Sequence, residues 1–383
     1  MPSRRLPFDL KPNAFARAQA SHRVEFDLTV TNPTVCGLPY GPELLLDLAR
    51  AEGLRYRPDP KGLLSAREAV AADYAARGVR VDPERIVLTA SSSEAYGFLF
   101  KLLCDPGDGV LVPTPSYPLF EHLAALEGVR ALAYALDPDH GWQPQPASLE
   151  LAASARAAIL VHPNNPTGSW VTRDAAEGLA GGSLPLIVDE VFLDFPLGAA
   201  APPSTFASRT NGLTFTLGGL SKSCGLPQLK LSWIVVSGPD LEVASALERL
   251  EFIADTYLSV GTPVQVALPS ILERARPLRE AIRARCAGNL ATAQRLAAST
   301  PSVSVPVPGG GWSLVTRFPK VITEETLILR LLEEHGVAIQ PGYFFDFPSE
   351  GYLVASLLPE PSIFETGFGR VLELCQQESE RFR

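Results

Sequence analysis

Polar residues that could do chemistry follow short apolar segments, one after another along the chain. The apolar segments are RIVLT, GVLVP, AILVH and LPLIV. The polar residues that follow them are Ser91, Ser92, Ser93, Tyr117, Asn165 and Asp189. In open α/β sheets, ligands bind at the carboxyl ends of the strands. If the apolar segments are strands of one sheet, this order predicts a shared site.

The first two features suit a flat ligand that carries an anionic group. Ser91, Ser92 and Ser93 lie between an expected strand and an expected helix. Backbone N–H groups and hydroxyls at a helix N-terminus suit a phosphate, but serine is also a preferred helix cap, which is the alternative interpretation. Tyr117, in the sequence PSYP, offers a ring for stacking; the alternative is simple packing in a turn.

Asn165 and Asp189 add an amide and a carboxylate. Asn165 belongs to HPNNPTG, residues 162–168, a composition typical of a turn that would aim an amide rigidly. His162, which begins this segment, is interpreted as structural. A carboxylate at a buried strand end, such as Asp189, needs a partner. A protonated pyridine nitrogen would be one, and a helix cap or a salt bridge is the alternative.

Lys222 lies in the segment GLSKSCGLP, one expected strand after Asp189. A lysine in such a loop is usually a solvated surface residue. Lysine can also form an imine with an aldehyde, and burial can lower its pKa until the amine acts as a base. The second interpretation gains support from the order of the other polar groups.

A sheet is needed to position these side chains. The expected strands are 85–89, 109–113, 158–162, 184–188, 213–217 and 232–237. The expected helices are 65–77, 93–103 and 241–257, the last with a clear apolar face. Short apolar strands between helices predict an α/β fold, with a mostly parallel sheet covered by helices on both faces. The large domain is therefore expected to have three layers, α/β/α.

The pattern changes after about Pro277. A long helix rich in arginine comes first, then strands over 302–307 and 312–317, and then a helix over 324–335. Two short strands and a last helix complete the chain. This predicts a smaller α+β C-terminal domain that the N-terminal segment completes. The predicted boundaries are 45–275 for the large domain, and 1–44 with 276–383 for the small domain.

Length, charge and cysteines bound the class of protein. A chain of 383 residues suits two packed domains. The net charge of −9 argues against nucleic acid or an anionic membrane as a partner. Five scattered cysteines without a CxxC pair predict neither a disulfide framework nor a metal site. No apolar run approaches the roughly 18 residues of a membrane helix, so we expect a cytoplasmic protein.

The ordered set NNPTG, then DE, then GLSK followed by GLP resembles the class I and II aminotransferases. These are fold-type I enzymes of the aspartate aminotransferase superfamily that use pyridoxal 5'-phosphate (PLP). The resemblance covers nearly the whole chain, from Asn32 to the last helix. It implies a PLP-dependent aminotransferase, EC 2.6.1.-, that moves an amino group from an amino acid or amine to a 2-oxo acid by a ping-pong mechanism. It also implies a homodimer with shared active sites.

The resemblance implies a role for each matching residue. Lys222 would be the catalytic residue, which forms the aldimine with PLP and carries protons. Asp189 would pair with the pyridine nitrogen, and Asn165 would bind the phenolic oxygen. The other cofactor contacts would be a stacking Tyr117, a phosphate site at Ser91, Ser92 and Ser93, and Tyr56, which would reach the phosphate of the neighbouring subunit.

Three positions depart from the family pattern. Phe192 stands where the family usually has a tyrosine that also binds the phenolic oxygen, and its loss should raise the pKa of the aldimine. Lys230 replaces an arginine on the phosphate, which keeps the charge but loses the planar two-pronged grip. Val354 occupies the place of the arginine that binds the substrate's α-carboxylate.

Val354 leaves substrate binding open. The carboxylate would bind another cation, such as Arg23, Arg317 or a neighbouring subunit's Arg57, or the substrate would be an amine without an α-carboxylate. A PLP-dependent lyase, cyclase or decarboxylase is the alternative enzyme, since these differ only in which bond lies perpendicular to the ring. A non-catalytic PLP-binding regulator is a further alternative, although the segment before Asn32 leaves no room for a DNA-binding domain.

Overall fold

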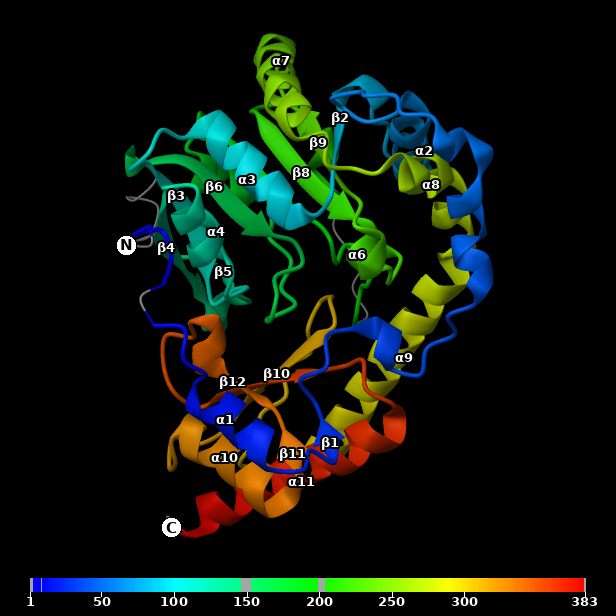
Figure 1. Cartoon of the computed structure of the whole chain (residues 1–383). Helices are drawn as coiled ribbons and strands as arrows, with labels where there is room; N and C mark the ends of the chain where they lie inside the picture. Colours follow the sequence, from blue (N-terminus) through cyan, green and yellow to red (C-terminus); the bar gives the residue numbers. More distant parts are fainter. Residues whose placement is uncertain (1–2, 8, 146–152, 199–203, 382–383) are drawn as a thin grey trace.

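The computed structural model describes residues 3–7, 9–145, 153–198 and 204–381 (Figure 1). A larger and a smaller lobe lie one above the other in this view, and we use these two names below. The large lobe contains an eight-stranded sheet, and the small lobe contains a three-stranded and a two-stranded sheet.

The large sheet has the strand order β2-β9-β8-β7-β6-β3-β4-β5. Its strands are β2 (Ile86–Thr89), β3 (Gly109–Thr114), β4 (Arg130–Asp137), β5 (Gln143–Pro144), β6 (Ala155–Val161), β7 (Leu186–Asp189), β8 (Thr214–Gly219) and β9 (Ser232–Ser237). The central strands from β8 to β4 pair in parallel, whereas β9 and β5 run against their neighbours. The mostly parallel sheet is therefore confirmed.

Helices cover both faces of this sheet, as the alternation along β7 shows. Ile187 packs in one core cluster with α3 (Ser92–Leu103), α4 (Phe120–Leu126) and α7 (Asp240–Tyr257). Its neighbours Leu186 and Val188 point the other way and pack with α5 (Arg173–Ala180). Successive side chains of a strand point to opposite faces, so a strand apolar on both sides needs cover on both. The three-layer prediction is confirmed.

The small lobe joins the two ends of the chain. Strand β1 (Phe26–Asp27) pairs in parallel with β11 (Val337–Ala338), and β13 (Tyr352–Ser356) pairs antiparallel with β10 (Ser313–Arg317) and β12 (Gln340–Pro341). The helices are α1 (Ala14–Ser21), α10 (Glu324–His335) and α11 (Pro361–Arg381). The N-terminal segment thus contributes α1 and β1 to this α+β lobe.

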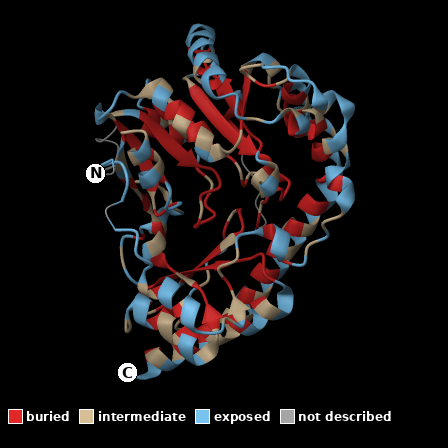
Figure 2. Cartoon of the chain, viewed as in Figure 1, coloured by how far each residue is buried: buried red, intermediate tan, exposed pale blue. Residues whose placement is uncertain are grey.

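Three helices lie along the side of the molecule, and the last of them continues to the small lobe (Figure 1). They are α2 (Leu64–Ala76), α8 (Thr262–Arg274) and α9 (Arg276–Ala297). One core cluster includes Trp233 and Leu220 of the large lobe together with Leu314 and Leu353 of the small lobe. Figure 2 shows buried residues along the sheet and on the inward sides of these helices. Because this core is continuous, the boundaries at 44/45 and 275/276 stay a prediction.

One expected strand is wrong, and one long observed strand was not predicted. The strand expected over 302–307 is wrong: Ser304 forms only an isolated bridge with Arg317. Pro306 lies within this segment, with Pro301 and Pro308 at its ends, and proline cannot donate to a ladder. Strand β4 was not predicted, and most of its residues are partly or fully exposed.

No helix among the described residues is long and apolar enough to cross a membrane.

Candidate active site

Lys222 lies on the short helix α6 (Leu220–Ser223), directly after β8. Its Nζ is 5.5 Å from the ring centre of Phe192 and 5.0 Å from that of Trp312. Within the described part of the chain, this amine forms no hydrogen bond or ion pair. Burial lowers the pKa of Lys222, and the nearby charge of Asp189 only partly opposes that effect. The result is an amine poised to act as a nucleophile or a base.

Asp189 is the last residue of β7 and is buried. Its Oδ2 accepts a hydrogen bond of 3.0 Å from the hydroxyl of Tyr96, and its Oδ1 accepts one of 3.1 Å from the backbone N–H of Val191. Burial raises the pKa of Asp189, while these two donors and Lys222 lower it. Sequence reasoning missed Tyr96, because nothing in its local pattern distinguishes it from a core residue of α3.

Asn164 and Asn165 have different surroundings. The side chain of Asn164 is buried; its Nδ2 donates to the carbonyl of Pro115 and to Thr167 Oγ1, and its Oδ1 accepts from Ser116 Oγ. Asn165 is only partly buried, and its Oδ1 accepts a hydrogen bond of 3.1 Å from Ser313 Oγ. Asn164 therefore holds the loop together, while Asn165 contacts the small lobe through Ser313.

The serine triplet divides between capping and exposure. Ser91 caps α3: its Oγ accepts a hydrogen bond of 3.1 Å from the N–H of Glu94. The capping interpretation therefore holds for the Ser91 hydroxyl. Ser92 and Ser93 are the first two residues of the helix, where the helix itself supplies no acceptor for backbone N–H groups. Those two N–H groups remain suited to an anion.

Tyr117 lies on the loop after β3, with its ring against Phe120 at 6.2 Å. Burial raises the pKa of Tyr117, and the charge of Asp189 raises it further, which places the two side chains in the same surroundings. The neighbouring N–H of Ser116 donates to the carbonyl of Phe345 in the small lobe. Tyr117 is 41% exposed, so part of its surface is open to a ligand.

His162 takes no part in this group. Its ring is fully buried between Trp170 and Phe206, and its Nδ1 accepts a hydrogen bond of 3.1 Å from the N–H of Val171. Burial lowers the pKa of His162 to about 3, so the ring is neutral at physiological pH. These contacts agree with the structural interpretation.

Val354 is buried in an apolar cluster on β13. The other members of this cluster are Val315, Phe345, Phe347, Tyr352 and the partly buried Trp142 and Phe344. Arg317 approaches it at the end of β10, with Cζ 5.6 Å from the ring centre of Tyr352. A carboxylate would be poorly solvated beside Val354 itself, so this position offers no anion site.

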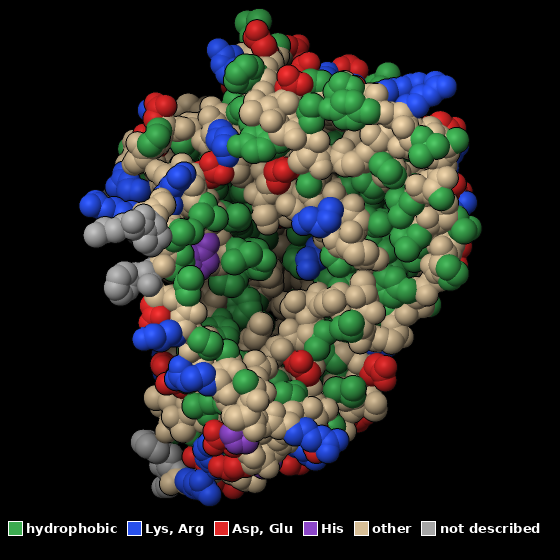
Figure 3. Space-filling view, in the orientation of Figure 1, with side chains coloured by type: hydrophobic (Ala, Val, Ile, Leu, Met, Phe, Trp, Pro, Cys, Tyr) green, Lys and Arg blue, Asp and Glu red, His purple; other side chains and the backbone are tan. Residues whose placement is uncertain are grey.

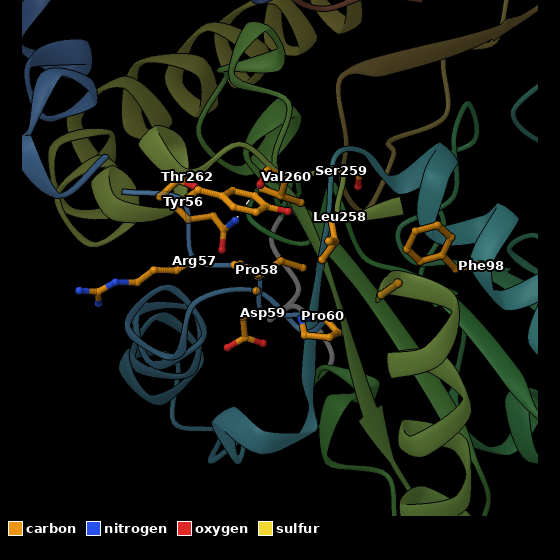
Figure 4. A pocket seen from close by; sticks show the side chains of 14 residues that line it. Tyr56, Arg57, Pro58, Asp59, Pro60, Phe98, Leu258, Ser259, Val260 and Thr262 are labelled. Carbon is orange, nitrogen blue, oxygen red and sulfur yellow. Dashed lines mark hydrogen bonds between the residues drawn. The ribbon is translucent and has the colours of Figure 1, made fainter. Parts of the chain in front are cut away.

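Lys230 and Tyr56 are both exposed on the surface of the chain. Lys230 follows β8 and α6, is exposed, and has a left-handed backbone with φ of 49°. Tyr56 is 76% exposed and lines a pocket with Thr262 and Gln265 of α8. Figure 4 shows Arg57 pointing away from this pocket. Neither Arg23 nor Arg57 forms an ion pair with any described residue.

A hollow separates the two lobes. Figure 3 shows it with hydrophobic side chains on its walls and Lys or Arg side chains at one edge. Beside Lys222, an open pocket is lined by Thr31, Asn32, Pro33, Thr34, Pro227 and Gln228. The structure therefore brings Lys222, Asp189 and Tyr117 into one region. Asn165 is connected to this region because its hydrogen-bond partner Ser313 directly follows Trp312, whose ring lies near Lys222.

Comparison with known proteins gives a consistent result. Residues 43–358 match the sequence model of the family described as aminotransferase class I and II. The chain is 27% identical to the glutamate-pyruvate aminotransferase AlaA of Haemophilus influenzae, over 87% of this chain and 86% of that protein. It is 28% identical to an alanine aminotransferase of Mycobacterium tuberculosis, over 90% of this chain and 84% of that protein. It also resembles the crystal structure of an Escherichia coli aminotransferase, with a TM-score of 0.84, 25% identity and 98% of each chain covered.

Proposed function

The chain belongs to the class I and II aminotransferases, and from that premise we propose that PLP is bound to Lys222 in the hollow between the lobes. The family and fold use this cofactor. The single observation that carries the assignment is the Lys222 amine, partly buried, without a hydrogen bond among the described residues, and close to the charge of Asp189.

The residues present fit the group. Asp189 would accept a hydrogen bond from the pyridine nitrogen and keep it protonated. Asn165 would donate its amide to the phenolic oxygen, and Tyr117 would stack on the ring. The phosphate would lie at the serine triplet and Lys230. The remaining proposed contact, Tyr56, requires a second subunit.

When bound, PLP supplies an aldehyde that condenses with amines and a ring that absorbs electrons. The protein supplies orientation and proton transfer. Lys222 would remove the proton from the α-carbon of the amino donor, because its lowered pKa leaves the amine neutral more often. The same amine would then deliver this proton to the cofactor carbon. Phe192 and Trp312 would limit access of water to Lys222.

We propose a homodimer in which Tyr56 of one subunit reaches the phosphate site of the other. Leu46, Leu54 and Tyr56 are 62%, 88% and 76% exposed within a short stretch of chain. Figure 3 shows hydrophobic side chains gathered at the right-hand edge of the molecule, where this stretch and α8 lie. Contiguous exposed apolar surface of this kind marks an interaction site.

We propose an amino acid as donor and a 2-oxo acid as acceptor. The named relatives act on glutamate, pyruvate and alanine, and this chain would use substrates of that general class. Its α-carboxylate site would differ, because Val354 lies in an apolar cluster. Arg317 lies beside that cluster, and Arg57, which forms no ion pair with the described residues, would be available to the site of a partner subunit. A cytoplasmic location stays a prediction, which five unpaired cysteines suit.

The test is an absorbance spectrum followed by a panel of amino donors. Protein loaded with PLP should absorb near about 420 nm or at shorter wavelength, as PLP imines do. Lys222→Ala should lose this band, and the matched control Lys320→Ala, at an exposed lysine, should keep it. A wild-type protein without the band would contradict the cofactor assignment. With an accepted donor, the pyridoxamine form should accumulate stoichiometrically; release of ammonia or CO2 instead would contradict transamination.

A further inference from the structure

A single side-chain hydrogen bond links the small lobe to the proposed cofactor contact in the large lobe. Ser313 Oγ donates to Asn165 Oδ1 over 3.1 Å, across 148 residues of sequence. Ser313 begins β10, and Asn165 lies in the loop after β6. The bond therefore joins a strand of the small lobe to a loop of the large lobe.

This bond fixes which end of the Asn165 amide faces the hollow. The oxygen is engaged by Ser313, while Nδ2 has no acceptor among the residues that the structure describes. Asn164, by contrast, has both ends of its amide occupied by the protein. An amide held by its oxygen presents its two N–H donors in the opposite direction. Asn165 is thus prepared to donate to a ligand acceptor, not to accept from a donor.

Backbone hydrogen bonds hold the chain just before Ser313 against the large lobe. The N–H of Gly310 donates to the carbonyl of Gly168 at 3.0 Å, and the N–H of Gly311 donates to the carbonyl of Phe195 at 2.8 Å. A Cβ added at Gly310 would lie 2.8 Å from the Trp170 ring and 3.0 Å from the Phe195 carbonyl. Only glycine allows this close approach of backbone to backbone. The docked loop presents Trp312 to Lys222 and Ser313 to Asn165.

We infer that Ser313 is a positioning residue that orients the Asn165 amide toward the phenolic oxygen of the cofactor. This inference rests on the proposed function, in which Asn165 contacts that oxygen. Phe192 brings no hydrogen-bond donor to the same region, so the orientation of Asn165 carries more of the stabilisation of the oxygen's negative charge. Without Ser313 the amide can rotate, and part of its population turns the oxygen toward the cofactor.

The predicted effect is on the proton shared between the lysine nitrogen and the phenolic oxygen. A donor on that oxygen stabilises the negative charge that remains after the proton leaves. Removing the hydroxyl of Ser313 should therefore raise the apparent pKa of the visible absorption band. The loss of one neutral hydrogen bond corresponds to a shift of about 0.5–1 unit.

The experiment is a spectrophotometric pH titration of PLP-loaded protein without substrate. Ser313→Ala should titrate at higher pH than wild type. Ser313→Thr and Ser313→Val have the same shape, so only the valine variant should show the shift. Ser302→Ala removes another small-lobe hydroxyl, which bonds Gln376 in α11, and should titrate as wild type. In an Asn165→Ala background, Ser313→Val should cause no further shift.

The outcomes separate the two proposals. No visible band in wild type overturns the cofactor assignment and leaves Ser313 without a role in it. A normal wild-type band with equal apparent pKa for the threonine and valine variants overturns the role of Ser313 alone. A valine shift that persists in the Asn165→Ala background overturns it as well, because the effect would then not pass through the amide.

Discussion

Nε of Arg279 donates a hydrogen bond of 2.7 Å to the backbone carbonyl of Ser223, the residue that follows Lys222. Arg279 lies near the start of α9 and is buried, and its Nη1 is 3.7 Å from carboxylate oxygens of both Asp73 and Asp194. The turn that carries Lys222 is therefore bonded to a buried cation, and this cation lies near two carboxylates. Sequence reasoning gave no sign of this contact.

Arg279→Met should destabilise the protein by about 1–3 kcal/mol, because it removes the buried hydrogen bond to Ser223 and one of the two arginines that pair with Asp73 and Asp194, the other being Arg77. Urea unfolding of the cofactor-free protein measures this directly. Arg276→Met is the matched control, because Arg276 is an exposed arginine of the same helix; it should change stability by less than about 0.5 kcal/mol. Equal effects of the two variants would show that Arg279 does not anchor this turn.

Asp189→Asn should separate catalysis from folding. The asparagine keeps the shape: its oxygen can accept from the N–H of Val191 while its NH2 group donates to the Tyr96 hydroxyl. It lacks the charge that would keep the pyridine nitrogen protonated. We expect kcat/KM for transamination to fall by about 100-fold or more, as when an electrostatic stabiliser is removed. The melting temperature should be unchanged or higher, because burial already disfavours this charge. An active enzyme with unchanged kcat/KM would contradict the role of Asp189.

Glu190 should make stability depend on pH. Burial raises the pKa of Glu190 from 4.5 to about 7, against hydrogen bonds from Thr205 and the N–H of Phe206. The folded state then binds the proton more tightly than the unfolded state, so stability is lost as pH rises from about 4.5 to about 7. At about 1.4 kcal/mol per unit of pKa difference, the upper limit is about 3 kcal/mol.

The measurement compares Glu190→Gln with wild type by urea unfolding at pH 5 and pH 8. The stability of the glutamine variant relative to wild type should be greater at pH 8 than at pH 5. His162, whose pKa is lowered to about 3, acts in both proteins and cancels in this comparison. A difference that stays constant with pH would show that Glu190 titrates normally.

Leu54→Asp should disrupt the proposed dimer. Leu54 is 88% exposed and ends the short 3-10 helix η3 (Ala51–Leu54), near the exposed Tyr56. A charge within an apolar interface has to be desolvated without a partner. Sedimentation should show a monomer with weakened PLP binding, whereas Val307→Asp, at an exposed residue of the small lobe, should remain dimeric. A dimeric Leu54→Asp protein with full PLP affinity would contradict the assigned interface.

The sequence predicted the parts of the fold and site that depend on local pattern. Helix 324–335 matches α10, and the strand expected over 232–237 matches β9. Lys222 and Asp189 were found because each follows an apolar strand in a recognisable order. Tyr96, Ser313 and Arg279 were missed, since each meets its partner only after distant segments fold together. Their neighbours in sequence are ordinary helix and strand residues and carry no signal of those contacts.

The indole of Trp312 gives the site a built-in optical reporter. Its ring centre is 5.0 Å from the Lys222 amine, well within the range over which an indole transfers excitation to a chromophore that absorbs at longer wavelength. The intrinsic fluorescence of this chain should therefore dim when Lys222 carries its cofactor and recover when the cofactor is removed. Loading and release could then be followed in real time, without a label and without a substrate.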